Sequence, residues 1–262
     1  MFIIGELING MYKNIGKAIK EKDKSAIQKC ALEQIKAGAD ALDVNCGPAS
    51  ADPVSDIQWL VNTIQEVTDK PVVLDSSKAK VIESGLKAVK NKVIINSTTA
   101  DAEKLQILVP LAKKYNAKLI GLTISSKGIP QNKDQRLELA AEIVAHCLEQ
   151  GFNLEDLYLD PIVMPVNVAQ AQMRDILESL HEFKIISHPS PKTIAGLSNV
   201  SQGTCVRSLV NRTFLTMAAA CGLDAAILDP LDKDLVDAAI TAELILNKQI
   251  YCDSYLDAYR KK

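Results

Sequence analysis

Short apolar runs alternate along this chain with longer segments in which apolar residues recur every three or four positions. The longer segments, for example residues 26–40 and 139–152, have the periodicity of amphipathic helices and stop at a glycine. The short runs are predicted strands, at residues 2–7, 41–45, 71–76, 93–97, 117–123, 157–161, 193–198 and 225–229. Strands that alternate with helices indicate βαβ units and a parallel sheet.

About eight such units in 262 residues predict an α/β fold of the (β/α)8 TIM-barrel type. The alternative is a doubly wound open sheet, which a glycine-rich nucleotide loop after the first strand would favour, and the sequence has no such loop. No linker or low-complexity tract divides the chain, so we expect one domain over residues 1–262. Residues 235–262 are helical in pattern beyond what one closing helix needs, which predicts a cover for the barrel floor or a homodimer contact.

Polar residues follow the apolar part of nearly every predicted strand. A single Asp or Asn at such a position is more often a turn former or a helix N-cap than a ligand-binding group. A whole set favours a binding site, because barrel active sites are built at the carboxyl ends of the strands. The set comprises Glu6, Asp43, Asn45, Asp75, Asn96, Thr123, Asp160, Ser198, Asn199 and Asp229.

Carboxylates and amides with few cations suit a neutral, planar ligand that is rich in N–H donors. A phosphate would instead require Lys, Arg or a glycine-rich helix start near the last two strands, where Arg207 is the nearest certain cation. The sequence therefore favours a pterin-like heterocycle over a sugar phosphate.

Composition narrows the partners further. The net charge of -2, from 30 Lys and Arg against 32 Asp and Glu, predicts no binding to nucleic acid or to a membrane surface. The six cysteines and three histidines are scattered without metal-ligand spacing, so no protein-bound metal is expected. The start of the chain lacks a signal peptide pattern, and we expect a cytoplasmic protein.

Several motifs closely resemble the methyltetrahydrofolate:corrinoid methyltransferase family, which includes the folate module of cobalamin-dependent methionine synthase. They are LDVNCGP (42–48), LDSS (74–77), INST (95–98), LYLDP (157–161), GLSNVSQ (196–202) and NRTFLTMAAACGLDAAILDP (211–230). The resemblance runs from about residue 1 to residue 260 and implies a pterin-binding barrel like that of dihydropteroate synthase.

The resemblance also implies roles for individual residues. Asp160 and Asn96 would hold the pyrimidine edge of the pterin, Asp75 another edge nitrogen, and Asn199 the folate N5 as the catalytic group. The other matching positions, expected to bind the substrate, are Glu6, Asp43, Asn45, Ser198, Gln202 and Arg207. Leu7 departs from the family, which usually has an arginine there, so any contact of that arginine is missing.

The implied reaction moves a methyl group, in either direction, between N5 of tetrahydrofolate or 5-methyltetrahydrofolate and the cobalt of a corrinoid. The chain contains no D-x-H-x-x-G cobalamin motif, so the cobalamin is expected on a separate corrinoid protein that docks over the barrel mouth. The alternatives are a dihydropteroate synthase-like enzyme, which needs more basic residues for a pyrophosphate leaving group, and a non-catalytic folate-binding module. A metal-dependent barrel hydrolase would need histidine ligands that the sequence lacks.

Overall fold

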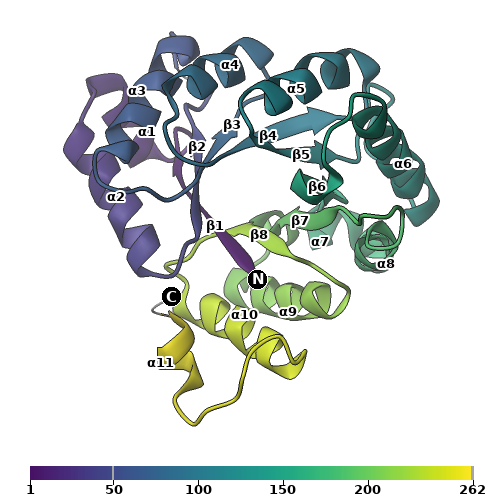
Figure 1. Ribbon diagram of the computed structural model, residues 1–262. Helices are drawn as coiled ribbons and strands as arrows, with labels where there is room; N and C mark the ends of the chain where they lie inside the picture. Colours follow the sequence, from purple (N-terminus) through teal and green to yellow (C-terminus); the bar gives the residue numbers. More distant parts are fainter. Residues whose placement is uncertain (49, 261–262) are drawn as a thin grey trace.

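Eight parallel strands close into a barrel in the computed structural model, which describes residues 1–48 and 50–260 (Figure 1). Each strand pairs with its neighbour in sequence, and β1 also pairs with β8. That last pairing closes the barrel, so the (β/α)8 prediction is confirmed and the open sheet is wrong. The strands are β1 Phe2–Asn9, β2 Ala41–Asn45, β3 Val72–Asp75, β4 Val93–Thr99, β5 Lys118–Leu122, β6 Leu157–Asp160, β7 Lys192–Gly196 and β8 Ala225–Leu228.

Helices surround the strands on the outside of the barrel (Figure 1). Several begin where the side chain of an N-cap residue, for example Asp52 before α3 or Asn132 before α6, accepts a backbone N–H of the first turn. The helices are α1 Lys13–Glu21, α2 Lys24–Lys36, α3 Pro53–Gln65, α4 Ala79–Ala88, α5 Ala102–Lys114, α6 Lys133–Glu149, α7 Val166–Ala169, α8 Met173–Phe183, α9 Arg207–Ala220, α10 Lys233–Ile245 and α11 Tyr255–Arg260. Short 3-10 turns are η1 Leu154–Asp156, η2 Gln170–Gln172 and η3 Leu197–Ser201.

The C-terminal segment forms two helices rather than one. Helix α10 packs beside α9, and α11 lies on the outer side of α10, where Arg260 forms an ion pair with Asp237 (Figure 1). The segment therefore packs against the wall of the barrel, and its last residues, 261–262, lie outside the described residues. In residues 1–48 and 50–260, no helix has the length and apolar character needed to cross a membrane.

One apolar side chain from each strand fills the inside of the barrel. These buried residues are Ile4, Ala41, Val73, Ile94, Ile120, Tyr158, Ile194 and Ala225. Side chains along a strand alternate between its two faces, so the residue two positions further along also points inward, nearer the carboxyl end. Those residues are Glu6, Asp43, Asp75, Asn96, Leu122, Asp160, Gly196 and Ile227. The alternation thus gathers the strand-end carboxylates at one mouth of the barrel.

A bulge in β1 lies beside Glu6. The pairing of β1 with β2 shifts between Gly5 and Ile8, which frees the backbone N–H of Leu7 from the sheet. The side chain of Gln34, fully buried on α2, accepts that N–H through Oε1 at 3.0 Å. A Cβ at Gly5 would lie 2.4 Å from the same oxygen, so only glycine leaves room for the glutamine.

Replacing Gln34 should therefore destabilise the protein. In Gln34→Leu the N–H of Leu7, which is half-buried, loses its acceptor, and we expect the free energy of unfolding to fall by about 1–3 kcal/mol. Urea denaturation followed by circular dichroism measures the change, with the exposed Gln170→Leu on η2 as the control. Equal stability of Gln34→Leu and the wild type would show that the bulge does not depend on this hydrogen bond.

Candidate functional site

A cavity of about 540 Å³ opens at the carboxyl ends of the strands. All eight inward-facing strand-end positions line it, from Glu6 on β1 to Ile227 on β8. The last residues of β1 and β4, the segments that follow the strands and the start of α9 complete its wall with Asn9, Met11, Tyr12, Ser97, Ile162, Val163, Ser198, Asn199, Gln202 and Arg207. The cavity therefore lies where barrel enzymes hold their substrates.

Two amide side chains hold two of its carboxylates. Asn96 Nδ2 donates to Asp43 Oδ1 at 3.0 Å, and Asn45 Nδ2 donates to Asp75 Oδ2 at 2.7 Å. Burial raises the pKa of Asp43 well above its usual range, and the nearby charge of Asp75 raises it further. Burial also raises the pKa of Asp75, against the hydrogen bond from Asn45. Because neutral amides rather than cations satisfy these carboxyl groups, a ligand with N–H donors would find acceptors there.

Asp160 is held by the backbone. The N–H of Ile162 donates to Asp160 Oδ1 at 2.7 Å, and the backbone of Gly196 also donates to this carboxyl group. Asp160 is 7% exposed, and burial raises its pKa to about 6 against these two hydrogen bonds. The two backbone donors leave other lone pairs of the carboxylate available to a ligand in the cavity.

Glu6 on β1 and the loop after β7 form another part of the cavity wall. Ser198 Oγ donates to Glu6 Oε1 at 2.8 Å, and burial raises the pKa of Glu6. Arg207 fixes the turn that carries Ser198, since its Nε donates to Ser201 Oγ at 3.1 Å and its Nη2 to the carbonyl of Ser198 at 3.3 Å. Arg207 is thus the cation of a cavity that contains four carboxyl groups, those of Glu6, Asp43, Asp75 and Asp160.

Asn199 lies on η3 with its amide free for a ligand. Its side chain forms no hydrogen bond to any part of the chain that the structure describes, so it does not cap the following helix. The bare α-carbon of Gly196 admits the amide, because a Cβ there would lie 3.0 Å from Asn199 Nδ2. Gln202 lines the same side of the cavity and is exposed.

The structure brings nine of the ten predicted site residues to this cavity; Asn45 is the exception. Asn45 lines an adjoining cavity of about 440 Å³ and contacts the site through Asp75. Leu7, at the position of the family's arginine, is not among the described residues that line the main cavity.

Two other strand-end residues have local roles. Thr123 is buried and donates to the backbone carbonyl of Asp160, and Asp229 accepts the N–H of Leu231 in a turn. In residues 1–48 and 50–260, no cluster of three or more His, Cys, Asp or Glu side chains is arranged to hold a metal ion.

Sequence reasoning missed several other residues of the cavity. Tyr12 and Val163 follow strands, but nothing in the local pattern separates them from other loop positions. Ser97 lies within β4, next to Asn96. Asn9 could have been predicted from the sequence, because it is a polar residue that ends an apolar run.

The fold and the cavity define a (β/α)8 barrel with an acidic, amide-rich mouth. The family model of the pterin binding enzymes matches residues 13–229, and the chain belongs to this family.

The chain is also similar to curated relatives and, in its fold, to solved structures. The chain is 28% identical to the methylcorrinoid:tetrahydrofolate methyltransferase of Eubacterium limosum, over all of this chain and 97% of that protein. It is 25% identical to the methionine synthase of Mycobacterium tuberculosis, over 87% of this chain but only 20% of that protein. Dihydropteroate synthases from Coxiella burnetii and Yersinia pestis, each 14% identical, superpose with TM-scores of 0.72 and 0.71 over 95% of this chain and 94% of theirs, which shows the shared fold.

The raised pKa of Asp43 predicts a pH-dependent gain in stability when its charge is removed. Asp43→Asn keeps the acceptor for Asn96 but cannot ionise, so we expect its free energy of unfolding to exceed that of the wild type by about 1–3 kcal/mol at pH 8. The pKa of Asp43 in the folded protein lies above the ordinary value of an aspartate. The cost in stability of burying the charge is therefore absent below the ordinary pKa, and it grows as the pH rises above it. Urea denaturation at pH 4 and pH 8 tests this; an equal difference at both pH values would contradict it.

Proposed function

We propose that this protein is an enzyme that transfers a methyl group between N5 of tetrahydrofolate and the cobalt of a corrinoid carried by a partner protein. The observation that carries the proposal is an acidic, amide-rich cavity in a pterin-binding barrel that aligns end to end with a methylcorrinoid:tetrahydrofolate methyltransferase. The substrates are tetrahydrofolate or 5-methyltetrahydrofolate and the cobalamin of the partner. That no metal is bound by the protein itself stays a prediction, as does the cytoplasmic location.

The pterin would bind among the strand-end residues of β3, β4 and β6. In this proposal Asp160 and Asn96 contact the pyrimidine edge, and Asp75 contacts another edge nitrogen. A carboxylate accepts from the 2-amino and N3 hydrogens, while an amide serves an edge with both donors and acceptors. Glu6, Asp43, Ser198, Gln202 and Arg207 would form the rest of the binding surface, with Asn45 acting through Asp75.

Asn199 would assist the methyl transfer at N5. The cobalt, in its reduced nucleophilic form, attacks the methyl carbon, and N5 keeps the electron pair of the broken carbon–nitrogen bond. N5 is a poor leaving group unless it is protonated or accepts a strong hydrogen bond. An amide N–H aimed at N5 would stabilise the electron pair that N5 gains in the transition state. The free amide of Asn199 supports this role, because it can donate to N5 in one state and rotate to accept from protonated N5 in another. The proton would come from solvent through the region of Asp75.

The mouth of the barrel offers a surface for the corrinoid protein. Exposed apolar side chains lie on or near the loops that follow β1, β6, β7 and β8; they are Met11, Val168, Val206, Leu209 and Leu231. Large exposed apolar groups around a polar cavity are typical of protein docking sites. A partner seated there would bring its cobalt to the cavity opening.

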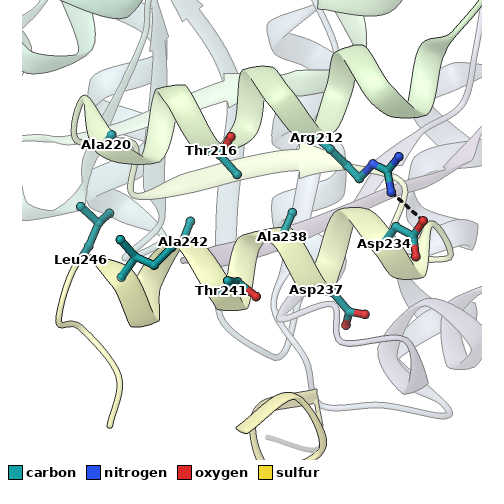
Figure 2. Close-up of a pocket in the computed structure, with 10 residues that line it drawn as sticks. Arg212, Thr216, Ala220, Asp234, Asp237, Ala238, Thr241, Ala242 and Leu246 are labelled. Atoms are coloured by element: carbon teal, nitrogen blue, oxygen red, sulfur yellow. Dashed lines mark hydrogen bonds and ion pairs between the residues drawn. The ribbon is translucent and has the colours of Figure 1, made fainter. Parts of the chain in front are cut away.

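We also propose a homodimer, through the groove of about 510 Å³ between α9 and α10. Figure 2 shows small side chains, including Thr216, Ala220 and Ala238, facing the groove from the two helices, with the Arg212–Asp234 ion pair at one end. Ile245 on α10, which also lines the groove, is 78% exposed. Small residues on paired helices allow a second copy to pack closely, and burying Ile245 would favour the contact.

Asn199→Ala should separate catalysis from binding. If the amide acts mainly in the transition state, we expect the methyl-transfer rate to fall on the order of 10²–10³-fold while folate affinity changes much less. Stopped-flow transfer from methyltetrahydrofolate to cob(I)alamin gives the rate, and a folate titration of the same protein gives the affinity. Asn62→Ala, on the exposed face of α3, is the matched control. Wild-type turnover by Asn199→Ala would remove the proposed role, and absence of transfer by the wild type would remove the proposed function.

Ala238→Arg should disrupt the dimer, because it places a long charged side chain in the groove between α9 and α10. Light scattering on a size-exclusion column is expected to give about twice 28.5 kDa for the wild type and about 28.5 kDa for the variant. Ala141→Arg, on the exposed surface of α6, should keep the wild-type mass. A wild-type mass of 28.5 kDa at all working concentrations would overturn the homodimer.

A further inference from the structure

Arg136, on the first turns of α6, is completely buried yet forms no ion pair with a described residue. Its guanidinium donates to three neutral oxygens instead. Nε donates to the carbonyl of Pro161 at 2.8 Å, Nη1 to the carbonyl of Asn132 at 3.1 Å, and Nη2 to Gln172 Oε1 at 2.9 Å. A buried cation without a carboxylate partner is costly, and the three directed bonds of the guanidinium compensate part of that cost.

These bonds hold the loop that follows β6. Pro161 and Gln172 lie near the two ends of that loop, and its residues Ile162 and Val163 line the cavity. Gln172 Nε2 also donates to Gln131 Oε1 at 3.2 Å, which ties the loop to the start of α6. Arg136 therefore joins two loops at the barrel mouth from a position outside the cavity.

The turn beside Pro161 is strained. Ile162 has a φ of 63°, a left-handed conformation that β-branched residues rarely adopt. In that conformation its N–H reaches Asp160 Oδ1 at 2.7 Å. Strained backbone persists only where its surroundings hold it, and the bond from Arg136 to the adjacent carbonyl is placed to do so.

We propose that Arg136 is a positioning residue for pterin recognition: by holding the Pro161 carbonyl it maintains the turn at Ile162 that orients the Asp160 carboxylate. This inference rests on the proposed function, because it assumes that Asp160 binds the pterin edge. Arg136 contacts no substrate and acts through Asp160 alone. Lysine at this position keeps the charge, but its donors all leave one nitrogen, so it cannot reach the three acceptors that Nε, Nη1 and Nη2 of the planar guanidinium reach.

Arg136→Lys should weaken tetrahydrofolate binding and change its pH dependence. We expect affinity at pH 7 to fall about tenfold, because the recognising carboxylate is misplaced. As the pH falls and Asp160 takes up a proton, affinity should also be lost at a higher pH than in the wild type. The pKa of Asp160 is about 6 and is kept from rising further by the Ile162 N–H, so losing that donor raises it. The other charged groups nearby are the same in the wild type and in Arg136→Lys, so they do not account for a difference between the two. They are Glu6, Asp43, Asp75 and Arg207, which face the same cavity, and Asp175, which faces Arg136.

The experiment is isothermal titration calorimetry with tetrahydrofolate from pH 5 to pH 8. The expected result is a midpoint for loss of affinity that lies roughly half a unit or more higher in Arg136→Lys. Arg174→Lys, an exposed arginine on α8, is the matched control and should bind as the wild type does. A merely structural role would lower stability without moving the midpoint.

A second variant keeps the test decisive if Arg136→Lys does not fold. Gln172→Met removes the acceptor of Nη2 at a half-buried position and should raise the midpoint in the same direction by a smaller amount. Binding by the wild type with an unshifted midpoint in the folded variants overturns the role of Arg136 alone. No tetrahydrofolate binding by the wild type overturns the proposed function, and the inference with it.

Discussion

The packed interior of the barrel is the constraint on which the site depends. One apolar side chain from each strand fills the centre, and this layer forces the next inward positions to face the mouth. Ile4 thereby sets the direction of Glu6, Val73 that of Asp75, and Tyr158 that of Asp160, through the two-residue repeat of a strand. The site is an extension of the core: its polar groups occupy the last layer of the same pattern.

Carboxyl groups on an apolar layer lose solvent, and the protein compensates them with neutral donors. Asn96, Asn45, Ser198 and backbone N–H groups satisfy part of each carboxylate and leave the remaining lone pairs toward the cavity. The raised pKa values of Asp43 and Asp160 reflect this incomplete compensation. A site whose carboxylates lack some hydrogen-bond donors favours a ligand that supplies them. The same lack of donors lowers the stability of the protein without a ligand.

Two buried polar side chains from the surrounding helices hold the backbone of this last layer. Gln34 on α2 accepts the N–H freed by the bulge beside Glu6, and Arg136 on α6 donates to the carbonyl beside Asp160. Each reaches an irregular backbone group at the strand end, where the sheet no longer supplies a partner. The geometry of the mouth is thus shared between the strands and the helices behind them.

The sequence by itself determined the strands and the polar residue at almost every strand end, because these follow from local periodicity. The count of about eight strand–helix units favoured a barrel, and the pairing of β1 with β8 closed it. The motifs of the family resemblance also indicated Asp75, Asn96 and Asp160 as site residues. Only the tertiary structure decided which polar residues meet. Asn45 turns to Asp75 instead of the cavity, and Asn199 keeps a free amide. Tyr12 and Arg136 gave no local signal, since their positions depend on loops and helices that come together only when the barrel closes.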